Sequence, residues 1–256
     1  MSVTPEAQVP ALRARDLGFR VGGLDIIKGI SLSVPSGHFL GIIGPNGAGK
    51  STLLNLLSGV LRPSAGTIEL AGRVVTHTRP AARARRGLGR TFQTSSLFNG
   101  LSAYENVRLA AQAHLGGSAR FYRPPRARDA ASISALRALE QVGLADQAPR
   151  LTGLLSHGDK RKVELAVLLA SRADVLVLDE PMAGVTADDV DQLSALIGGL
   201  HRDGHTVLMV EHHMSVIVGL AQTIAVLDAG QLLALGTPAE VVANETVQQA
   251  YLGQPL

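Results

Sequence analysis

Residues 44–51 have the sequence G-P-N-G-A-G-K-S, which matches the phosphate-binding pattern G-x-x-x-x-G-K-[ST]. Its glycines let the backbone curl so that successive N–H groups point at anionic oxygens. Lys50 is long enough to reach the β- and γ-phosphates of a nucleotide, and the Ser51 hydroxyl can bind Mg²⁺. The pattern therefore predicts a site for MgATP or MgGTP. The residues expected to contact the nucleotide are Gly44, Pro45, Asn46, Gly47, Ala48, Gly49, Lys50, Ser51 and Thr52.

Two adjacent carboxylates supply the other groups that this chemistry needs. Asp179 ends the apolar run of residues 176–178, and Glu180 follows it directly. Proteins with such a phosphate loop hold Mg²⁺ with a carboxylate at the end of a second strand, which is the position predicted for Asp179. A carboxylate just beyond the strand end can orient or deprotonate an attacking water, and we expect Glu180 to do so.

The sequence around the phosphate loop can position it. Residues 38–43 are predicted to form a short buried strand, and residues 50–58 are predicted to open a helix. A strand, a loop and a helix N-terminus in this order place the positive end of the helix dipole at the phosphates.

Apolar strands alternate with amphipathic helices along most of the chain. Two hairpins are predicted, with turns at Ala71-Gly72 and Ala229-Gly230. We predict an α/β fold made of a P-loop core with a mostly parallel sheet, an N-terminal antiparallel β portion and an inserted α-helical subdomain. The core and β portion are expected at about residues 9–93 and 170–256, and the helical subdomain at about 94–169. The other predicted strands are residues 11–19, 26–34, 175–178 and 206–210, and the other predicted helices are residues 130–142, 160–170, 188–201 and one that opens at residues 237–240.

The composition limits the classes of protein that the chain can represent. Its 256 residues are 46% hydrophobic and include no cysteine, which excludes a disulfide framework, a cysteine-ligated zinc site and a thiol nucleophile. We expect no secretory signal at the polar N-terminus and no membrane span, because no apolar run approaches the required ~18–20 residues. The arginines at positions 83, 85, 86 and 90 are expected to form a solvated face.

Three further motifs complete an ordered set. Residues 91–93 have the sequence T-F-Q, residues 155–160 have the sequence L-S-H-G-D-K before a predicted helix, and Glu211 and His212 end a predicted strand. Together with the phosphate loop and the Asp179-Glu180 pair, this order resembles the ATP-binding subunit of ABC transporters. The resemblance extends from about Leu12 to Gly253.

The resemblance implies roles for individual residues. Glu180 would be the catalytic base, His212 would hydrogen-bond the γ-phosphate, and Gln93 would contact Mg²⁺ or the attacking water and link the site to the membrane partner. Ser156 and Gly158 would belong to the signature loop, which in this family completes the nucleotide site of a second subunit. A helix N-terminus suits that contact because its free N–H groups bind anions. The implied metal ligands are Ser51, Gln93 and Asp179.

Three positions depart from the family's usual motifs. His157 stands where the signature usually has Gly, and Thr186 stands where most members have Asp. Both forms resemble the subgroup that takes up branched-chain amino acids, urea and short amides. Val21 stands where an aromatic residue usually stacks on adenine, although Phe19 lies two residues earlier on the same face of a strand. We expect Val21 to contact the base without stacking and to discriminate bases weakly.

The resemblance implies an ATPase that binds ATP and Mg²⁺ and dimerises with a second ATP-binding subunit, identical or related. The dimer would dock on two membrane-spanning permease subunits, as a peripheral protein at the cytoplasmic face of the membrane. The implied task is uptake of a branched-chain or other hydrophobic amino acid, urea or a short amide, delivered by a solute-binding protein. Nucleic acid is not an expected partner.

Three alternatives fit the sequence less well. A soluble ABC ATPase acting on nucleic acid or ribosomes usually carries two cassettes or a long coiled coil, and this chain has one cassette and no sustained heptads. A small-molecule kinase tends to lack both the signature around Ser156 and the paired carboxylates. A cassette that binds ATP but barely hydrolyses it would not need Glu180, Gln93 and His212.

Overall fold

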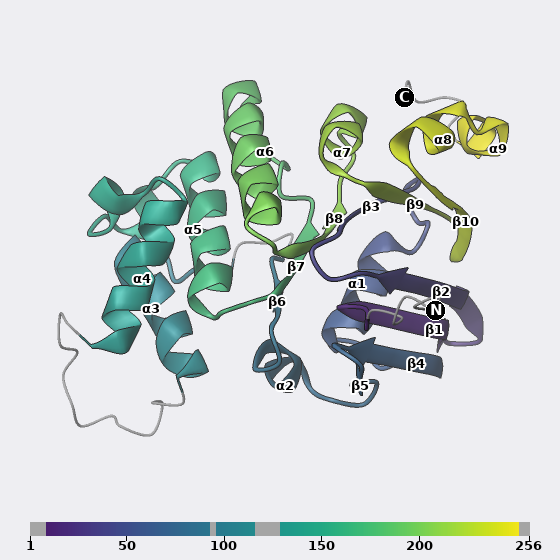
Figure 1. Ribbon diagram of the computed structural model, residues 1–256, viewed down its shortest axis with the longest axis horizontal. Coiled ribbons are helices and arrows are strands. Elements are labelled where there is room, and N and C mark those ends of the chain that lie inside the picture. Colours follow the sequence, from purple (N-terminus) through teal and green to yellow (C-terminus); the bar gives the residue numbers. More distant parts are fainter. Residues whose placement is uncertain (1–8, 93–95, 116–128, 251–256) are drawn as a thin grey trace, which may run out of the picture.

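The computed structural model describes residues 9–92, 96–115 and 129–250, which form two sheets and the helices around them (Figure 1). The strands are β1 (Leu12–Val21), β2 (Leu24–Val34), β3 (Phe39–Ile43), β4 (Ala65–Leu70), β5 (Arg73–Val74), β6 (Leu88–Arg90), β7 (Val175–Asp179), β8 (Thr206–Val210), β9 (Thr223–Asp228) and β10 (Gln231–Gly236). The helices are α1 (Lys50–Ser58), α2 (Pro80–Ala84), α3 (Ala103–His114), α4 (Ala130–Gln141), α5 (His157–Ala170), α6 (Ala187–Arg202), α7 (Met214–Leu220), α8 (Pro238–Ala243) and α9 (Glu245–Ala250).

The six-stranded sheet has the order β10-β9-β3-β8-β7-β6, and its neighbours are parallel except in the β9–β10 hairpin. The four-stranded sheet has the order β2-β1-β4-β5 and is antiparallel. Both confirm the predicted α/β fold class. Helices α3, α4 and α5 lie together in a lobe beyond the β6 edge (Figure 1). The predicted limits of that helical subdomain, about residues 94 and 169, stay a prediction.

The core consists of two apolar layers on opposite faces of the six-stranded sheet. Alternation along β3 places Leu40 and Ile42 in one layer, with α1 and the antiparallel sheet, and Phe39 and Ile43 in the other, with the remaining helices. Helix α1 is therefore held between the two sheets. Since α1 follows the phosphate loop, its fixed position also fixes the loop.

Side-chain caps define where several helices begin. Ser102 and Thr237 each form a capping box, in which the hydroxyl accepts from the N–H three residues later and a glutamate reaches back. The helix predicted to open at residues 237–240 is thus confirmed, although it ends at Ala243 and α9 follows it. Helix α5 begins at His157, three residues before its predicted start.

Four short elements were not predicted individually: α2, β6, α7 and α9. Each is too short to show a period in the sequence, and packing on the larger elements stabilises them. No helix in the described part of the chain has both the length and the apolar character to cross a bilayer.

Candidate nucleotide-binding site

The phosphate loop connects β3 to α1, as the sequence predicts. Gly44 has φ 155°, and a Cβ there would lie 2.2 Å from the carbonyl oxygen of Leu227, so the close approach to β9 requires glycine. Gly49, at the N-cap of α1, adopts the left-handed region and offers no side chain to cap the helix. The first N–H groups of α1 are therefore left for another acceptor, which suits a phosphate.

Lys50 lies at the centre of this loop and is buried. Its Nζ donates to the carbonyl oxygens of Gly44 at 2.7 Å and Pro45 at 3.0 Å. Burial lowers the pKa of Lys50, and the charges of Glu180 and Asp179 oppose that effect. The side chain is thus curled within the loop, at the position where a negative charge would be stabilised.

A cavity of about 330 Å³ opens against the loop. Residues 46–52 form one side of it, and Ile26, Glu180 and His212 line the rest. Ile26 comes from β2, and the sequence analysis did not identify it because no motif contains it. Val21, the predicted base contact, does not line this cavity and is 54% exposed at the end of β1. Phe19 packs partly buried against the apolar layer around α1.

Asp179 ends β7 with its carboxylate buried, and its charge acts on Lys50 of the loop, although Asp179 does not line the cavity. Its Oδ2 accepts from Arg90 Nη2 at 2.9 Å, and its backbone N–H donates to Thr91 Oγ1 at 3.2 Å. Its Oδ1 is buried and has no hydrogen-bond partner among the described residues. A buried carboxylate oxygen without a partner is costly, and a divalent cation is a ligand that would satisfy it. This environment fits a Mg²⁺ site.

Glu180 and His212 meet at the wall of the cavity. His212 Nε2 lies 3.1 Å from Glu180 Oε1, and the His212 side chain is 46% exposed while that of Glu180 is 15% exposed. The Glu180 backbone has φ 49°, a left-handed conformation that L-residues rarely adopt. A strained carboxylate aimed at the cavity is the geometry expected of a group that acts on an attacking water.

Ser156 and Gly158 do not line the cavity. Ser156 caps α5 by accepting from the Asp159 N–H at 3.0 Å, and Gly158 packs so closely on α6 that an added Cβ would lie 2.5 Å from the Asp189 carboxylate. Thr186 caps α6 through the same Asp189, so the hydroxyl takes over the capping that an Asp would supply. Within one chain, then, the signature lies apart from the phosphate loop.

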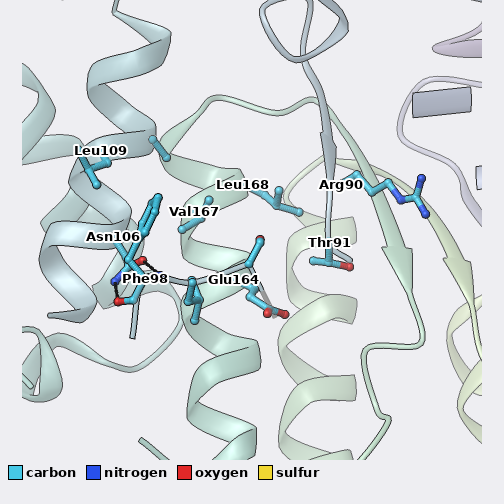
Figure 2. A pocket seen from close by; sticks show the side chains of 11 residues that line it. Arg90, Thr91, Phe98, Asn106, Leu109, Glu164, Val167 and Leu168 are labelled. Carbon is cyan, nitrogen blue, oxygen red and sulfur yellow. Dashed lines mark hydrogen bonds between the residues drawn. The ribbon is translucent and has the colours of Figure 1, made fainter. Parts of the chain in front are cut away.

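Gln93, the third predicted metal ligand, lies outside the described residues. Its neighbours Thr91 and Phe92 are described, and they lead from β6 toward a second pocket of about 210 Å³ between β6, α3 and α5 (Figure 2). In Figure 2, Phe98 lies beside Asn106, whose amide accepts from the Phe98 N–H at 2.8 Å and donates to its carbonyl oxygen at 3.1 Å.

Two of the arginines that the sequence analysis assigned to a solvated face are buried. Arg83 is fully buried and donates to the carbonyl oxygens of Leu56, Leu57 and Thr76 at 2.6 to 3.0 Å, while Arg90 reaches Asp179. The solvated-face prediction is therefore wrong for these two. The sequence shows which residues are charged. It does not show which carbonyl or carboxylate groups the fold brings close to them.

A phosphate loop on a mostly parallel sheet, with an Asp-Glu pair at the end of another strand, defines a P-loop nucleoside triphosphatase. The comparisons narrow that class: the ABC transporter family model matches residues 27–183, and a model described as branched-chain amino acid ATP-binding cassette transporter matches residues 231–255. The chain belongs to the ABC transporter family, as an ATP-binding and ATP-hydrolysing subunit.

Relatives match nearly the whole chain. BraF of Pseudomonas aeruginosa, a high-affinity branched-chain amino acid transport ATP-binding protein, is 37% identical over 251 residues, which are 96% of this chain and 98% of BraF. LivG of Escherichia coli K12, with the same description, is 36% identical over 252 residues, 96% of this chain and 98% of LivG. LptB of the same organism, a lipopolysaccharide export system ATP-binding protein, is 32% identical over 243 residues, 95% of this chain and 97% of LptB.

Solved structures agree with this assignment. A nucleotide-free ATP-binding cassette from an ABC transporter superposes with a TM-score of 0.85 at 27% identity, covering 96% of this chain and 100% of that one. The ADP conformation of MJ1267, an ATP-binding cassette of an ABC transporter, gives a TM-score of 0.84 at 27% identity, covering 96% and 99%. The predicted ATPase and transporter class are confirmed.

Proposed function

We propose that this chain hydrolyses ATP to power uptake of branched-chain amino acids. The observation that carries this substrate class is the match of residues 231–255 to the branched-chain family model, on a chain that resembles BraF and LivG from end to end. LptB, an export protein, is less similar, so import is favoured. The soluble ATPase acting on nucleic acid or ribosomes is not favoured.

The proposed chemistry uses the cavity beside the phosphate loop. The uncapped N-terminus of α1 and Lys50 bind the phosphates. Mg²⁺, held by Ser51, Asp179 and Gln93, would neutralise charge on the β- and γ-phosphates. The open Oδ1 of Asp179 supports this assignment on the protein's side.

Glu180 accepts the proton of the attacking water in this proposal. Its carboxylate lines the cavity, and His212 lies within hydrogen-bond distance of its Oε1. When His212 Nε2 carries a proton, it donates to that oxygen and holds the carboxylate in one orientation. The same imidazole is half-exposed at the cavity wall, where it can hydrogen-bond the γ-phosphate.

Ser156 and Gly158 serve the nucleotide of a second subunit in this proposal. Their separation from the cavity of their own chain supports it, because the signature residues otherwise have no ligand to contact. ATP bound at the seam between two chains stabilises the closed dimer, and hydrolysis removes that stabilisation. The dimer partner is either a second copy of this chain or a related cassette.

A mixing experiment tests the shared site. Lys50→Met destroys one chain's own phosphate site, and Ser156→Arg destroys the site that the chain completes in its partner. In a mixed dimer, one site carries both changes and the other carries neither. We expect each variant alone to be inactive and the mixture to regain ATPase activity, whereas a mixture as inactive as its components contradicts the shared site. If this chain dimerises only with a related cassette, the two changes are placed in the two different cassettes of the co-purified complex.

The pocket between β6, α3 and α5 is the proposed docking site for a cytoplasmic helix of the permease. Leu97, Phe98 and Leu109 give it an apolar lining, and Phe98 is 61% exposed although aromatic (Figure 2). An exposed apolar patch of this kind marks a protein contact. The Phe92 ring lies under the Arg90 guanidinium, and Arg90 in turn donates to Asp179. The proposed docking site is therefore linked to the metal-binding carboxylate by two contacts. This contact would hold the chain peripherally at the cytoplasmic face.

Affinity purification from native membranes tests the transporter assignment. We expect the tagged chain to bring down one or two polytopic membrane proteins, and cells whose only copy is Glu180→Gln to lose uptake of labelled leucine. Labelled urea and acetamide, tested in parallel, distinguish the other cargoes of the subgroup. Recovery of only ribosomal or nucleic-acid-bound proteins would contradict the transporter assignment.

A further inference from the structure

We propose that Arg90 is a positioning residue for the metal-binding carboxylate of this site, a proposal that rests on the proposed ATPase chemistry. Arg90 fixes Asp179 through one oxygen and leaves the other open for the cation. The motifs of the sequence do not include Arg90, which is the last residue of β6.

The Arg90 guanidinium joins three elements beneath the site. Its Nη2 donates to Asp179 Oδ2 of β7 at 2.9 Å, and its Nη1 donates to two groups of α1, Asn55 Oδ1 at 2.8 Å and Ser58 Oγ at 2.7 Å. The Arg90 and Asp179 side chains are only 5% and 4% exposed, so solvent screens the pair weakly. The planar fork of arginine holds such contacts in one fixed geometry, which the rotatable ammonium group of lysine does not.

The pair is held through one carboxylate oxygen only. Arg–carboxylate pairs often form two parallel hydrogen bonds, which would occupy both oxygens. Here Arg90 Nε has no partner among the described residues, and neither has Asp179 Oδ1. The donors to Asn55 and Ser58 hold the guanidinium in the orientation that keeps Oδ1 open.

The neighbouring residue completes this arrangement. Thr91 Oγ1 accepts from the backbone N–H of Asp179 at 3.2 Å, while Arg90 holds the side chain. Two consecutive residues at the end of β6 therefore fix both the backbone and the carboxylate of Asp179. The guanidinium also stacks over Phe92, with 5.1 Å between the guanidinium carbon and the ring centroid.

Two other roles are possible for the same contact, and they predict different results. A guanidinium that competes with the cation for Asp179 would weaken metal binding, so its removal would tighten it. A guanidinium that only ties β6, α1 and β7 together would affect unfolding but not the metal. If Arg90 is a positioning residue, its removal weakens nucleotide binding in the presence of Mg²⁺ and leaves nucleotide binding without metal unchanged.

The experiment measures the affinity of a fluorescent ADP analogue in EDTA and in Mg²⁺, for the purified chain and for Arg90→Met, Arg90→Lys and the control Arg85→Met. Arg85 is exposed at the C-terminal end of α2 and has no hydrogen bond to Asp179 among those found for the described residues. The Mg²⁺-linked gain is the ratio of the affinity in Mg²⁺ to the affinity in EDTA. We expect Arg90→Met to keep the affinity in EDTA within about twofold. The Mg²⁺-linked gain should fall about tenfold, as the loss of one charge-assisted hydrogen bond predicts. Arg90→Lys should lie between, and Arg85→Met should match the unsubstituted chain.

Mn²⁺ binding to the ADP complex, measured by electron paramagnetic resonance, gives a second readout. If Arg90→Met folds poorly, Ser58→Ala loosens the guanidinium without removing it and should reduce the Mg²⁺-linked gain by a smaller factor. The proposal would be overturned if the Mg²⁺-linked gain in affinity stayed unchanged in all Arg90 and Ser58 variants and only the melting temperature fell. A larger Mg²⁺-linked gain in Arg90→Met would also overturn it. If the unsubstituted chain itself shows no Mg²⁺-linked gain, the proposed ATPase site fails before Arg90 is considered.

Discussion

His212 Nε2 lies 3.1 Å from Glu180 Oε1, and this contact joins the residue after β7 to the second residue after β8 at the wall of the nucleotide cavity. The two strands are parallel neighbours, with Asp179 opposite Val210, so their carboxyl ends necessarily meet at one edge of the sheet. The register of one strand pair therefore brings the proposed base and the proposed γ-phosphate ligand together.

Glu180→Gln removes the base while keeping the size of the side chain. We expect turnover to fall by about 10²- to 10⁴-fold, the usual contribution of a general base. ATP binding should persist, so an ATP-bound dimer should accumulate, and size-exclusion chromatography with ATP measures it. Glu140→Gln, on the exposed face of α4, is the matched control and should leave turnover unchanged. Full activity of Glu180→Gln would remove Glu180 from the proposed mechanism.

Arg83→Met is expected to destabilise the chain strongly. Arg83 is fully buried at the C-terminus of α1, where its charge is stabilised by the helix dipole, and burial lowers its pKa to about 10, so it stays charged at neutral pH. Its loss leaves the buried carbonyl oxygens of Leu57 and Thr76 unsatisfied, while that of Leu56 still accepts from the Gly59 N–H, and the expected cost is about 3 kcal/mol. For a chain of this size we expect a melting temperature lower by roughly 10 °C. Arg86→Met, at an exposed position, should change it little, and equal effects of the two would refute this account.

His38 makes the stability depend on pH. Burial lowers the pKa of His38 from 6.5, and the nearby His201 lowers it further; its Nε2 lies 2.8 Å from Thr223 Oγ1. The unfolded chain then binds a proton more readily than the folded one, so stability is complete above about pH 6.5 and falls as the pH drops toward the lowered value. Urea unfolding at pH 7.5 and 5.5 measures this loss. His38→Gln should lose less stability between these pH values than the unsubstituted chain, whereas His77→Gln, at an exposed position, should lose the same amount.

Val21→Tyr tests the proposed adenine contact. Val21 is half-exposed at the end of β1 and can offer the base no ring to stack on. We expect tyrosine there to tighten ATP binding about fivefold, since aromatic stacking contributes ~1 kcal/mol, and to favour ATP over GTP more strongly. Leu24→Tyr, across the same hairpin, is the control. If GTP competes with ATP at the unsubstituted site no better than in relatives that carry the aromatic residue, the prediction of weak base discrimination is wrong.

Phe98→Ala should separate docking from catalysis. The ring is exposed beside the pocket of Figure 2 and away from the nucleotide cavity, whose lining does not include it. We expect co-purification of the permease to fall several-fold while ATP binding by the isolated chain stays unchanged. Ile133→Ala removes a similarly exposed apolar side chain from α4 and serves as control. Undiminished permease recovery with Phe98→Ala would place the docking surface elsewhere.

The sequence predicted best those parts that depend on local rules. The two hairpin turns are where Ala71-Gly72 and Ala229-Gly230 indicate, and all four residues have positive φ. The helix after the phosphate loop has the predicted bounds, because glycines precede it and follow it. The order of the motifs indicated the family and the grouping of Lys50, Glu180 and His212, which line one cavity.

What the sequence could not predict depends on contacts between distant segments. Arg83 and Arg90 have no local pattern that distinguishes them from the exposed Arg85 and Arg86. Their partners lie on α1, on β7 and at Thr76, which only the fold brings near. Ile26 lines the cavity because β2 passes the loop, a relationship that no spacing records. Element length was a further limit, since β6 has three residues and α2 has five.

The left-handed backbone at Glu180 lowers the stability of the fold at a residue whose side chain the proposed activity needs. A side chain held in that conformation costs roughly 1–2 kcal/mol, which glycine would not incur. A laboratory screen that rewards only survival at high temperature should therefore favour Glu180→Gly, and the survivors would be robust proteins without the proposed base. Thermostable variants for structural work are better sought at positions with ordinary backbone angles, where greater robustness does not remove the chemistry.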